Sequence, residues 1–192
     1  FAIQDPLFCG ILSRSNKDLI SLGKLMGKNT QQLEDWDHLT TTSLNNKLWD
    51  ERGIYNAYDL KAKQLIKVHS HSGFIPLFAQ IPSEEMAKKM QHYLMSSSFS
   101  GTDDQPAYLC PSHALDHPAF NSQRYWRGPI WLNINWMLAR GAKYYQMSSL
   151  SDRIMEDSIQ LVREKGFYEY FDPIKNSKLS TGCGTNDFSW TA

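Results

Sequence analysis

Two segments of the sequence concentrate side chains that can do chemistry. GFYEYFDP, residues 166–173, places Glu169 among four aromatic residues. A carboxylate between rings is partly desolvated, and such a group suits proton transfer as a general base or general acid. The alternative is a surface glutamate between buried rings, with Asp172-Pro173 forming a turn. The segment alone does not separate these two interpretations.

The other segment is RYWRGPIWLNINWML, residues 124–138, which holds three tryptophans within fifteen positions. We expect Tyr125, Trp126 and Arg127 in a loop at the mouth of a helix, where Gly128 lets another backbone segment approach closely. Aromatic faces, a guanidinium and free backbone donors at a helix N-terminus suit a sugar, because a pyranose ring has an apolar face and a rim of hydroxyls.

A plainer interpretation of the same segment is a piece of core. Buried aromatic residues usually serve packing, and on that interpretation Trp126, Trp131 and Trp136 all lie inside the protein. The periodicity after Pro129 places Ile130, Ile134, Met137 and Leu138 on one buried helical face. Only the rest of the sequence can favour one interpretation over the other.

The composition excludes several classes of protein. Twenty basic residues balance twenty acidic ones, so the chain lacks the positive field that binds nucleic acid or an anionic membrane. No apolar run reaches the length of a membrane-spanning helix. The three cysteines are far apart and odd in number, so we expect thiols and not a disulfide framework.

Metal and cofactor sites are not expected. His113 and His117 in HALDH have the i, i+4 spacing of a metal pair, but flanking prolines disfavour a regular helix and no third ligand is evident. His69 and His71 precede a glycine and are expected in a loop. GCGTND lacks the lysine and hydroxyl residue of a phosphate-binding loop.

The elements that must position these segments are predicted to be helical. We expect helices from Ser15 to Gly27, from Thr30 towards Gly53, from Pro82 through Leu94, over 129–146, and from Ser149 or Ser151 to Gly166. A further helix is expected from Phe188, a short hairpin within 55–68, and loops over 98–124 and 167–187. This layout favours antiparallel helix pairs with long, functional loops at one end.

Taken together, several motifs resemble one enzyme family. YWRGPIW, GFYEYFDP some forty residues later and the final GCGTNDFSWTA are similar to glycoside hydrolases of family 63 and the mannosylglycerate hydrolase type. FAIQDPLF, KLWDERGIYNAYD and GFIPLFAQIPSEEMAKKM extend the resemblance over nearly the whole chain. It implies an all-α (α/α)6 toroid, the six-hairpin glycosidase fold. Residues 1–192 are then the C-terminal half of one catalytic domain, truncated at both ends.

The resemblance also implies roles for individual residues. Glu169 corresponds to the general base, and Tyr125, Trp126 and Trp131 correspond to the wall of the subsite that holds the scissile sugar. Arg127 and Asn135 are expected to brace that loop more than to touch sugar, and Trp190 packs near the same pocket. The side chains expected to bind substrate are Tyr125, Trp126, Arg127, Trp131, Tyr168 and Trp190.

The implied reaction is hydrolysis with inversion at an α-glycosidic carbon. A carboxylic acid protonates the leaving oxygen while Glu169 activates water on the opposite face, with the two carboxyl groups roughly 6.5–9.5 Å apart. Relatives supply the acid from an SGxDNSP-like motif, which is absent from these residues. Asp5 matches a later segment of the family, so the acid is expected upstream and the chain alone is expected to be inactive.

The expected partner is a small carbohydrate, with no nucleic acid, membrane or cofactor. An α-glucoside or α-mannoside is expected: a glucosylglycerate-like or mannosylglycerate-like compound, or a short gluco-oligosaccharide. The main alternative is a non-catalytic toroid that binds carbohydrate or regulates, keeping the aromatic wall without the acid. An enzyme of another toroid family, such as a trehalase or a polysaccharide lyase, is a third possibility. Oligomeric state is left open.

Overall fold

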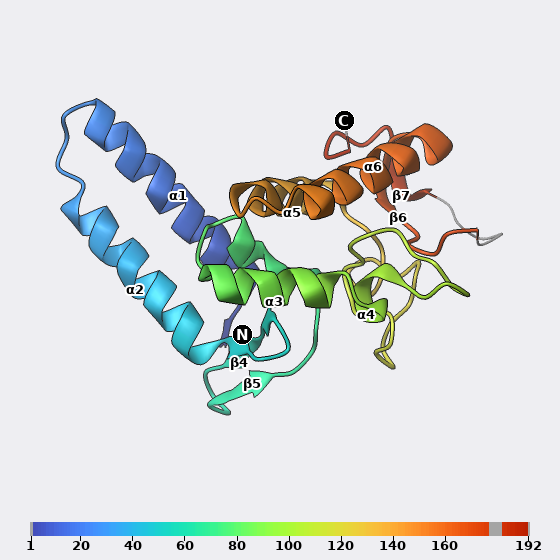
Figure 1. Ribbon diagram of the computed structural model, residues 1–192, viewed down its shortest axis with the longest axis horizontal. Helices are drawn as coiled ribbons and strands as arrows, with labels where there is room; N and C mark the ends of the chain where they lie inside the picture. Colours follow the sequence, from blue (N-terminus) through green and yellow to red (C-terminus); the bar gives the residue numbers. More distant parts are fainter. Residues whose placement is uncertain (1, 177–181, 192) are drawn as a thin grey trace.

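The protein is described here by a computed structural model that covers residues 2–176 and 182–191, and it is mostly helical (Figure 1). Its helices are α1 (Pro6–Leu25), α2 (Gln31–Lys47), the 3-10 helix η1 (His71–Leu77), α3 (Glu84–Leu94), α4 (Ser97–Ser100), α5 (Leu132–Tyr144) and α6 (Ser148–Lys165). Its strands are β1 (Ile3–Gln4), β2 (Trp49–Asp50), β3 (Ile54–Tyr55), β4 (Ala57–Asp59), β5 (Gln64–Ile66), β6 (Tyr168–Phe171) and β7 (Gly182–Asn186).

Antiparallel helix pairs dominate the arrangement, as the sequence predicts. α1 and α2 form one hairpin that extends away from the rest, and α5 and α6 form another (Figure 1). η1 lies between them and packs against α1, α3 and α5. Its apolar side chains, among them Phe74, Ile75 and Leu77, are fully buried and form the centre of the main core.

The beginning of α1 corrects the prediction. The helix starts at Pro6 and not at Ser15, because the Asp5 carboxylate caps it by accepting the Leu7 N–H at 2.7 Å. Proline is well tolerated at the first helical position, where its missing N–H would have no partner. Gly27 ends the helix as expected, with a φ of +64°. The predicted apolar face of Leu19, Leu22 and Met26 is exposed in this chain.

Other helix boundaries agree with the prediction more closely. Thr30 precedes α2, and the Ser83 hydroxyl accepts the Met86 N–H at the start of α3. α6 begins at Ser148, just before the predicted caps, and ends at Gly166, whose φ is +90°. α5 begins at Leu132, three residues later than predicted, because the backbone of Ile130 is extended and paired with a strand.

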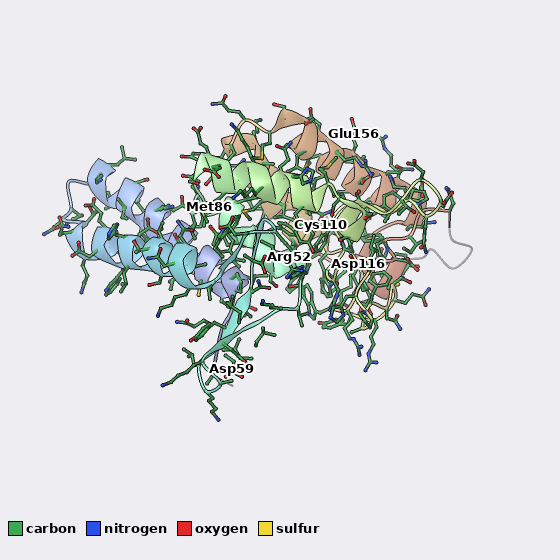
Figure 2. All side chains as sticks on the ribbon, turned by 60° about the horizontal axis from the view of Figure 1, so that its bottom comes forward. Arg52, Asp59, Met86, Cys110, Asp116 and Glu156 are labelled. Carbon is green, nitrogen blue, oxygen red and sulfur yellow. The ribbon has the colours of Figure 1, made fainter. Side chains whose placement is uncertain are left out.

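Short antiparallel sheets accompany the helices. The predicted hairpin within 55–68 is β4–β5, which β1 extends to three strands. It projects from the body of the protein with Asp59 towards its outer end (Figure 2). Residues 167–187 were expected to be a loop, but β6 and β7 pair there. Residues 188–191 contain a turn, so the helix predicted from Phe188 is absent from these residues.

The site-bearing segments meet at one end of the molecule. Residues 98–124 are largely irregular apart from α4, as expected, and lead into the N-terminus of α5. β6 and β7 lie beside the C-terminus of α6 (Figure 1). A second apolar cluster of Tyr108, Ile130, Leu161 and Phe171 joins these segments. Within the described residues, no helix has the length and apolar character that crossing a membrane requires.

Candidate active site

Direct backbone pairing brings the two chemistry-bearing segments together. The Ile130 N–H donates to the Phe171 carbonyl at 2.8 Å, and the Phe171 N–H donates to the Ile130 carbonyl at 3.0 Å. Both side chains are fully buried in the second cluster. Two reciprocal bonds in a dry environment fix the register of the segments, so the aromatic loop and Glu169 belong to one unit.

Four aromatic rings pack together above this pairing, and we call them the ring cluster: Tyr125, Trp126, Trp131 and Tyr170. The indoles of Trp126 and Trp131 stack with centroids 3.7 Å apart and an interplanar angle of 10°. Tyr170 stacks on Trp131 at 5.0 Å. The Tyr125 ring lies edge-on to each of the other three, at 5.0–5.6 Å.

The ring cluster has a buried side and an open side. Trp131 is completely buried, so its indole supports the other rings in this chain. Trp126 is 38% exposed and Tyr125 is 49% exposed. The prediction that all three tryptophans are core is therefore right for Trp131 only. Trp136 is 53% exposed on α5, where it packs against Phe78.

The backbone at Tyr125 is held in a conformation that side chains rarely adopt. Its φ is +41°, in the left-handed region. The Tyr125 carbonyl accepts the indole N–H of Trp131 at 3.3 Å, which ties the loop to the buried ring beneath it. Strained residues of this kind gather at binding and catalytic sites, where the surrounding structure enforces them.

Arg127 contacts the backbone of the loop that precedes it. Its side chain is exposed, and its Nε–H donates to the Ala119 carbonyl at 3.2 Å. The Arg127 carbonyl accepts the Asn121 N–H at 2.7 Å. A Cβ on Gly128 would lie 2.7 Å from the Asn121 carbonyl carbon, so the expected close backbone approach at this glycine is present.

Asn135 braces a different part of the structure. It is fully buried on α5, and its amide donates to the Leu109 carbonyl at 2.9 Å and to the Ser158 hydroxyl at 3.1 Å. These bonds join α5 to α6 and to Leu109 within the irregular stretch 98–124. Asn135 therefore acts on the ring cluster through the helix pair and not by contact with residues 125–127.

Glu169 is half-buried on β6 and leans towards β7. Its Oε2 accepts the Thr185 N–H at 3.4 Å. Burial raises the pKa of the neighbouring Tyr170 phenol, with smaller contributions from Cys183, Glu169 and Tyr125. The Glu169 carboxylate is thus an electrostatic neighbour of the ring cluster through Tyr170, the next residue along β6.

Tyr168 and Trp190 are not among the four rings of the ring cluster. Tyr168 packs against the second apolar cluster, and its carbonyl accepts the hydroxyl of Thr191. Trp190 is 54% exposed and tilted towards Trp131, with ring centroids 6.3 Å apart. The pairing of β6 with β7 shifts register between Tyr168 and Tyr170.

Sequence reasoning missed three side chains that shape the site. Tyr170 completes the ring cluster. The sequence feature that could have indicated this role is its position in an aromatic segment, two residues before Asp172. His71 lies edge-on to Trp126 at 5.4 Å and is buried. Asp172, also buried, accepts the Ser122 hydroxyl at 3.0 Å and the Ile174 N–H at 2.9 Å. The last two depend on tertiary contacts that no local pattern shows.

The histidine pair of HALDH does not form a metal site. The ring centroids of His113 and His117 lie 4.4 Å apart with the planes tilted by 53°, and Asp116 accepts the Ser98 hydroxyl. No group of three or more His, Cys, Asp or Glu side chains in the described part of the chain is arranged to hold a metal ion. Cys9, Cys110 and Cys183 are thiols, as predicted.

Comparison with known proteins assigns the chain to a family of glycoside hydrolases. The chain belongs to the family described as the mannosylglycerate hydrolase MGH1-like glycoside hydrolase domain, whose model matches residues 1–191. A mannosylglycerate hydrolase from Rubrobacter radiotolerans is 39% identical over the whole chain. The chain spans 42% of that relative's length, well under two thirds.

Solved structures agree with this assignment. The GH63 mannosylglycerate hydrolase from Thermus thermophilus matches 98% of the chain with a TM-score of 0.89, in a complex with glucose at 34% identity and in one with Tris and D-glycerate at 35%. The chain covers 46% and 44% of those two chains. Neutral trehalase from Saccharomyces cerevisiae matches 99% of the chain and 36% of its own, with a TM-score of 0.79 at 16% identity, a likeness of fold alone.

Proposed function

We propose that this chain carries the general base and the sugar-binding wall of an inverting α-glycosidase. Glu169 is the base, and the open side of the ring cluster, Tyr125 and Trp126, receives the sugar whose bond is cleaved. The pairing of Ile130 with Phe171 carries the proposal, because it fixes both parts in one rigid unit. Trp131 and Tyr170 serve as the support behind the wall.

The proposed chemistry uses the geometry of the two segments. The apolar face of the sugar lies on Trp126, and Glu169 takes a proton from a water molecule. The water oxygen bonds to the anomeric carbon while the glycosidic bond on the opposite face breaks. A carboxylic acid protonates the departing oxygen, which leaves as the hydroxyl of the aglycone. We assign that acid to residues outside these 192, since the chain spans less than half of its relative in Rubrobacter radiotolerans.

The proposed substrate is a small α-mannoside or α-glucoside. Mannosylglycerate comes first, because the relatives named for it are 34–39% identical to this chain. The Thermus thermophilus enzyme was solved with glucose and with D-glycerate, which are a sugar and a small hydroxy acid. Glucosylglycerate and short gluco-oligosaccharides are the further candidates, and we expect no cofactor in the reaction.

We also propose that these residues form the C-terminal half of an (α/α)6 toroid. Antiparallel helix pairs with functional loops at one end support this arrangement. The likeness to neutral trehalase, which extends over 99% of the chain at low identity, supports it as well. The apolar residues that α1 leaves exposed are those that a further layer of helices would cover.

The test of the base is Glu169→Gln in the full-length protein. We expect turnover of mannosylglycerate to fall by about a hundredfold or more, the usual effect of losing a general base, with substrate affinity retained. Glu156→Gln is the control, because Glu156 is exposed on α6 (Figure 2) and belongs to neither of the two site-bearing segments. Near-normal turnover by the Glu169 variant would remove this residue from the mechanism.

A non-catalytic carbohydrate-binding toroid is the second candidate. The exposed faces of Tyr125 and Trp126 suit sugar binding without any acid. This candidate predicts that the unaltered full-length protein binds mannosylglycerate but does not hydrolyse it. In that case Glu169→Gln would leave the binding affinity unchanged, which calorimetric titration would show.

A further inference from the structure

The strand β7 contains an irregularity directly opposite Glu169. Tyr168 pairs with Asn186, but Tyr170 pairs with Cys183, so β7 has one residue more than β6 across this step. Gly184 lies between these two paired positions of β7, and its φ is +74°. Bulges with a left-handed glycine bend a strand, and they recur beside active sites because they redirect a side chain.

Gly184 leaves room for the carboxylate of Glu169. A Cβ at this position would lie 2.5 Å from Glu169 Oε2 and 2.8 Å from Glu169 Cβ. It would also lie 2.8 Å from Tyr170 Cε1. Separations below 3.0 Å are essentially never seen for a real Cβ, so a larger residue would displace the Glu169 side chain, the Tyr170 ring or the strand.

The next residue of β7 supplies a donor to the same carboxylate. The Thr185 N–H points at Glu169 Oε2 from 3.4 Å. A backbone N–H that donates to a carboxylate oxygen restrains the direction of that oxygen. In the described part of the chain, no other hydrogen-bond donor reaches this carboxylate, so β7 is the element that sets its direction.

We propose that Gly184 is a positioning residue for the general base. The absence of a side chain at Gly184 lets the Glu169 carboxylate lie against the bulge, where the Thr185 N–H holds Oε2. Catalytic groups must be held within a fraction of an ångström of their working position, so a shift forced by one methyl group lowers the rate of the chemical step. The inference rests on the proposed role of Glu169.

Gly27 offers a matched control for the strain that alanine causes at positive φ. Its φ is +64°, close to that of Gly184, so alanine is strained at both positions. A Cβ on Gly27 would meet no atom within 4 Å, and the residue lies at the end of α1. Comparing the two alanine variants therefore separates backbone strain from displacement of Glu169.

The experiment measures mannosylglycerate hydrolysis by full-length Gly184→Ala and Gly27→Ala proteins. We expect kcat to fall at least tenfold in the Gly184 variant, with KM changed less than twofold. The Gly27 variant should keep its kcat while showing a similar loss of Tm. Equal effects of the two substitutions on kcat would overturn the inference.

A double-mutant cycle gives the decisive measurement. If Gly184 acts through Glu169, then adding Gly184→Ala to Glu169→Gln leaves the residual kcat unchanged, because the base is already lost. If the two substitutions instead lower kcat by factors that multiply, Gly184 has a role independent of Glu169, and the inference is overturned. Normal turnover by Glu169→Gln alone would instead overturn the proposed function, so the two failures are distinct.

Thr185→Pro is the second variant if Gly184→Ala does not fold. It removes the N–H donor to Glu169 Oε2 and adds no atom at Gly184. The same lower kcat, the same small change in KM and the same absence of an effect in the Glu169→Gln background are expected. The inference would be overturned if Thr185→Pro left kcat unchanged. It would also be overturned if Thr185→Pro and Glu169→Gln lowered kcat by factors that multiply.

Discussion

Trp126 is the residue at which packing and binding can be separated. It is stacked on Trp131 yet 38% exposed, so its removal leaves the buried indole in place. We expect Trp126→Ala in the full-length protein to weaken sugar binding by about tenfold, or roughly 1.4 kcal/mol, from lost ring contact. Its Tm should change little.

Trp136 supplies the control for this experiment. It is also about half exposed, but it lies on α5 against Phe78. Trp136→Ala should leave the affinity for mannosylglycerate unchanged. A collapse of thermal stability in Trp126→Ala, with affinity preserved in the folded fraction, would mean that Trp126 is a core residue.

His71 should make stability depend on pH. Its pKa is lowered from 6.5 to about 3, first by burial and then by the nearby His113, so the folded protein keeps it neutral. The unfolded chain binds a proton there below pH 6.5 and the folded protein does not. Folding stability therefore falls as the pH falls from 6.5 towards 3, by up to about 1.4 kcal/mol per pH unit from this group.

His71→Phe should flatten that dependence. Phenylalanine keeps a ring against Trp126, and it removes two buried nitrogens that have no hydrogen-bond partner in the described part of the chain. Denaturant titrations at about pH 5 and about pH 6.5 should show a pH slope smaller by up to one proton. Parallel slopes for the variant and the unaltered protein would contradict this expectation.

At the scale of elements, α6 is anchored by one buried carboxylate. Asp157 accepts the Leu109 N–H at 2.9 Å, Arg153 Nε–H at 2.8 Å and Lys175 Nζ–H at 2.8 Å, and its side chain is 4% exposed. These contacts join α6 to Leu109 within the irregular stretch 98–124 and to the chain after β6. Asp157 therefore supports segments that lead to both parts of the site, the aromatic loop and β6.

Removing that carboxylate should loosen the helix. We expect Asp157→Ala to lower the free energy of unfolding by about 3 kcal/mol, because it leaves charged partners uncompensated. Asp18→Ala breaks an exposed pair with Arg14 on α1 and should cost less than about 1 kcal/mol. Chemical denaturation of both variants tests the difference, and equal losses would contradict the anchoring role.

Helices could be predicted from the sequence far better than the strands beside the site. Apolar periodicity and glycine stops locate α3 and the end of α6, because those signals are local. The start of α1 was missed, although Asp5-Pro6 is a cap followed by a favoured first residue. β6 and β7 were missed since strands this short are stabilised by their pairing across the chain, which no window of sequence contains.

The candidate site was predictable in part and for two different reasons. The residue types alone allow either a sugar wall or a piece of core at Tyr125 and Trp126, and the family resemblance is what favours the wall and gives Glu169 its expected role. Tyr170 belongs to the ring cluster whereas Tyr168 packs against the second apolar cluster, and no local pattern of the sequence distinguishes the two. The buried contact of His71 with Trp126 joins positions far apart in sequence.

At the scale of the whole molecule, two apolar faces are exposed. One lies on α1 and α2 and includes Leu12, Leu22, Leu25, Trp36 and Leu39. The other is an apolar groove between α5 and α6, lined by residues that include Trp136, Met155, Ile159 and Trp190. Exposed apolar surface of this extent is unusual for a protein that stays monomeric.

These faces make the proposed half-toroid testable. We expect the isolated 192-residue chain to bind a hydrophobic dye, to self-associate and to leave mannosylglycerate intact. The full-length protein should do none of these. Dye fluorescence and size-exclusion chromatography on both forms give the comparison. An isolated chain that stays monomeric and binds no dye would contradict the half-toroid.

The stacked indoles of Trp126 and Trp131 give the protein an optical property. Their centroids are 3.7 Å apart and their planes nearly parallel, so their electronic transitions are coupled and one ring can quench the emission of the other. Trp126 faces solvent, and a ligand placed on it would change that coupling. If a sugar stacks on Trp126 as proposed, we expect its arrival to change the intrinsic tryptophan signal, which would time binding without any added label.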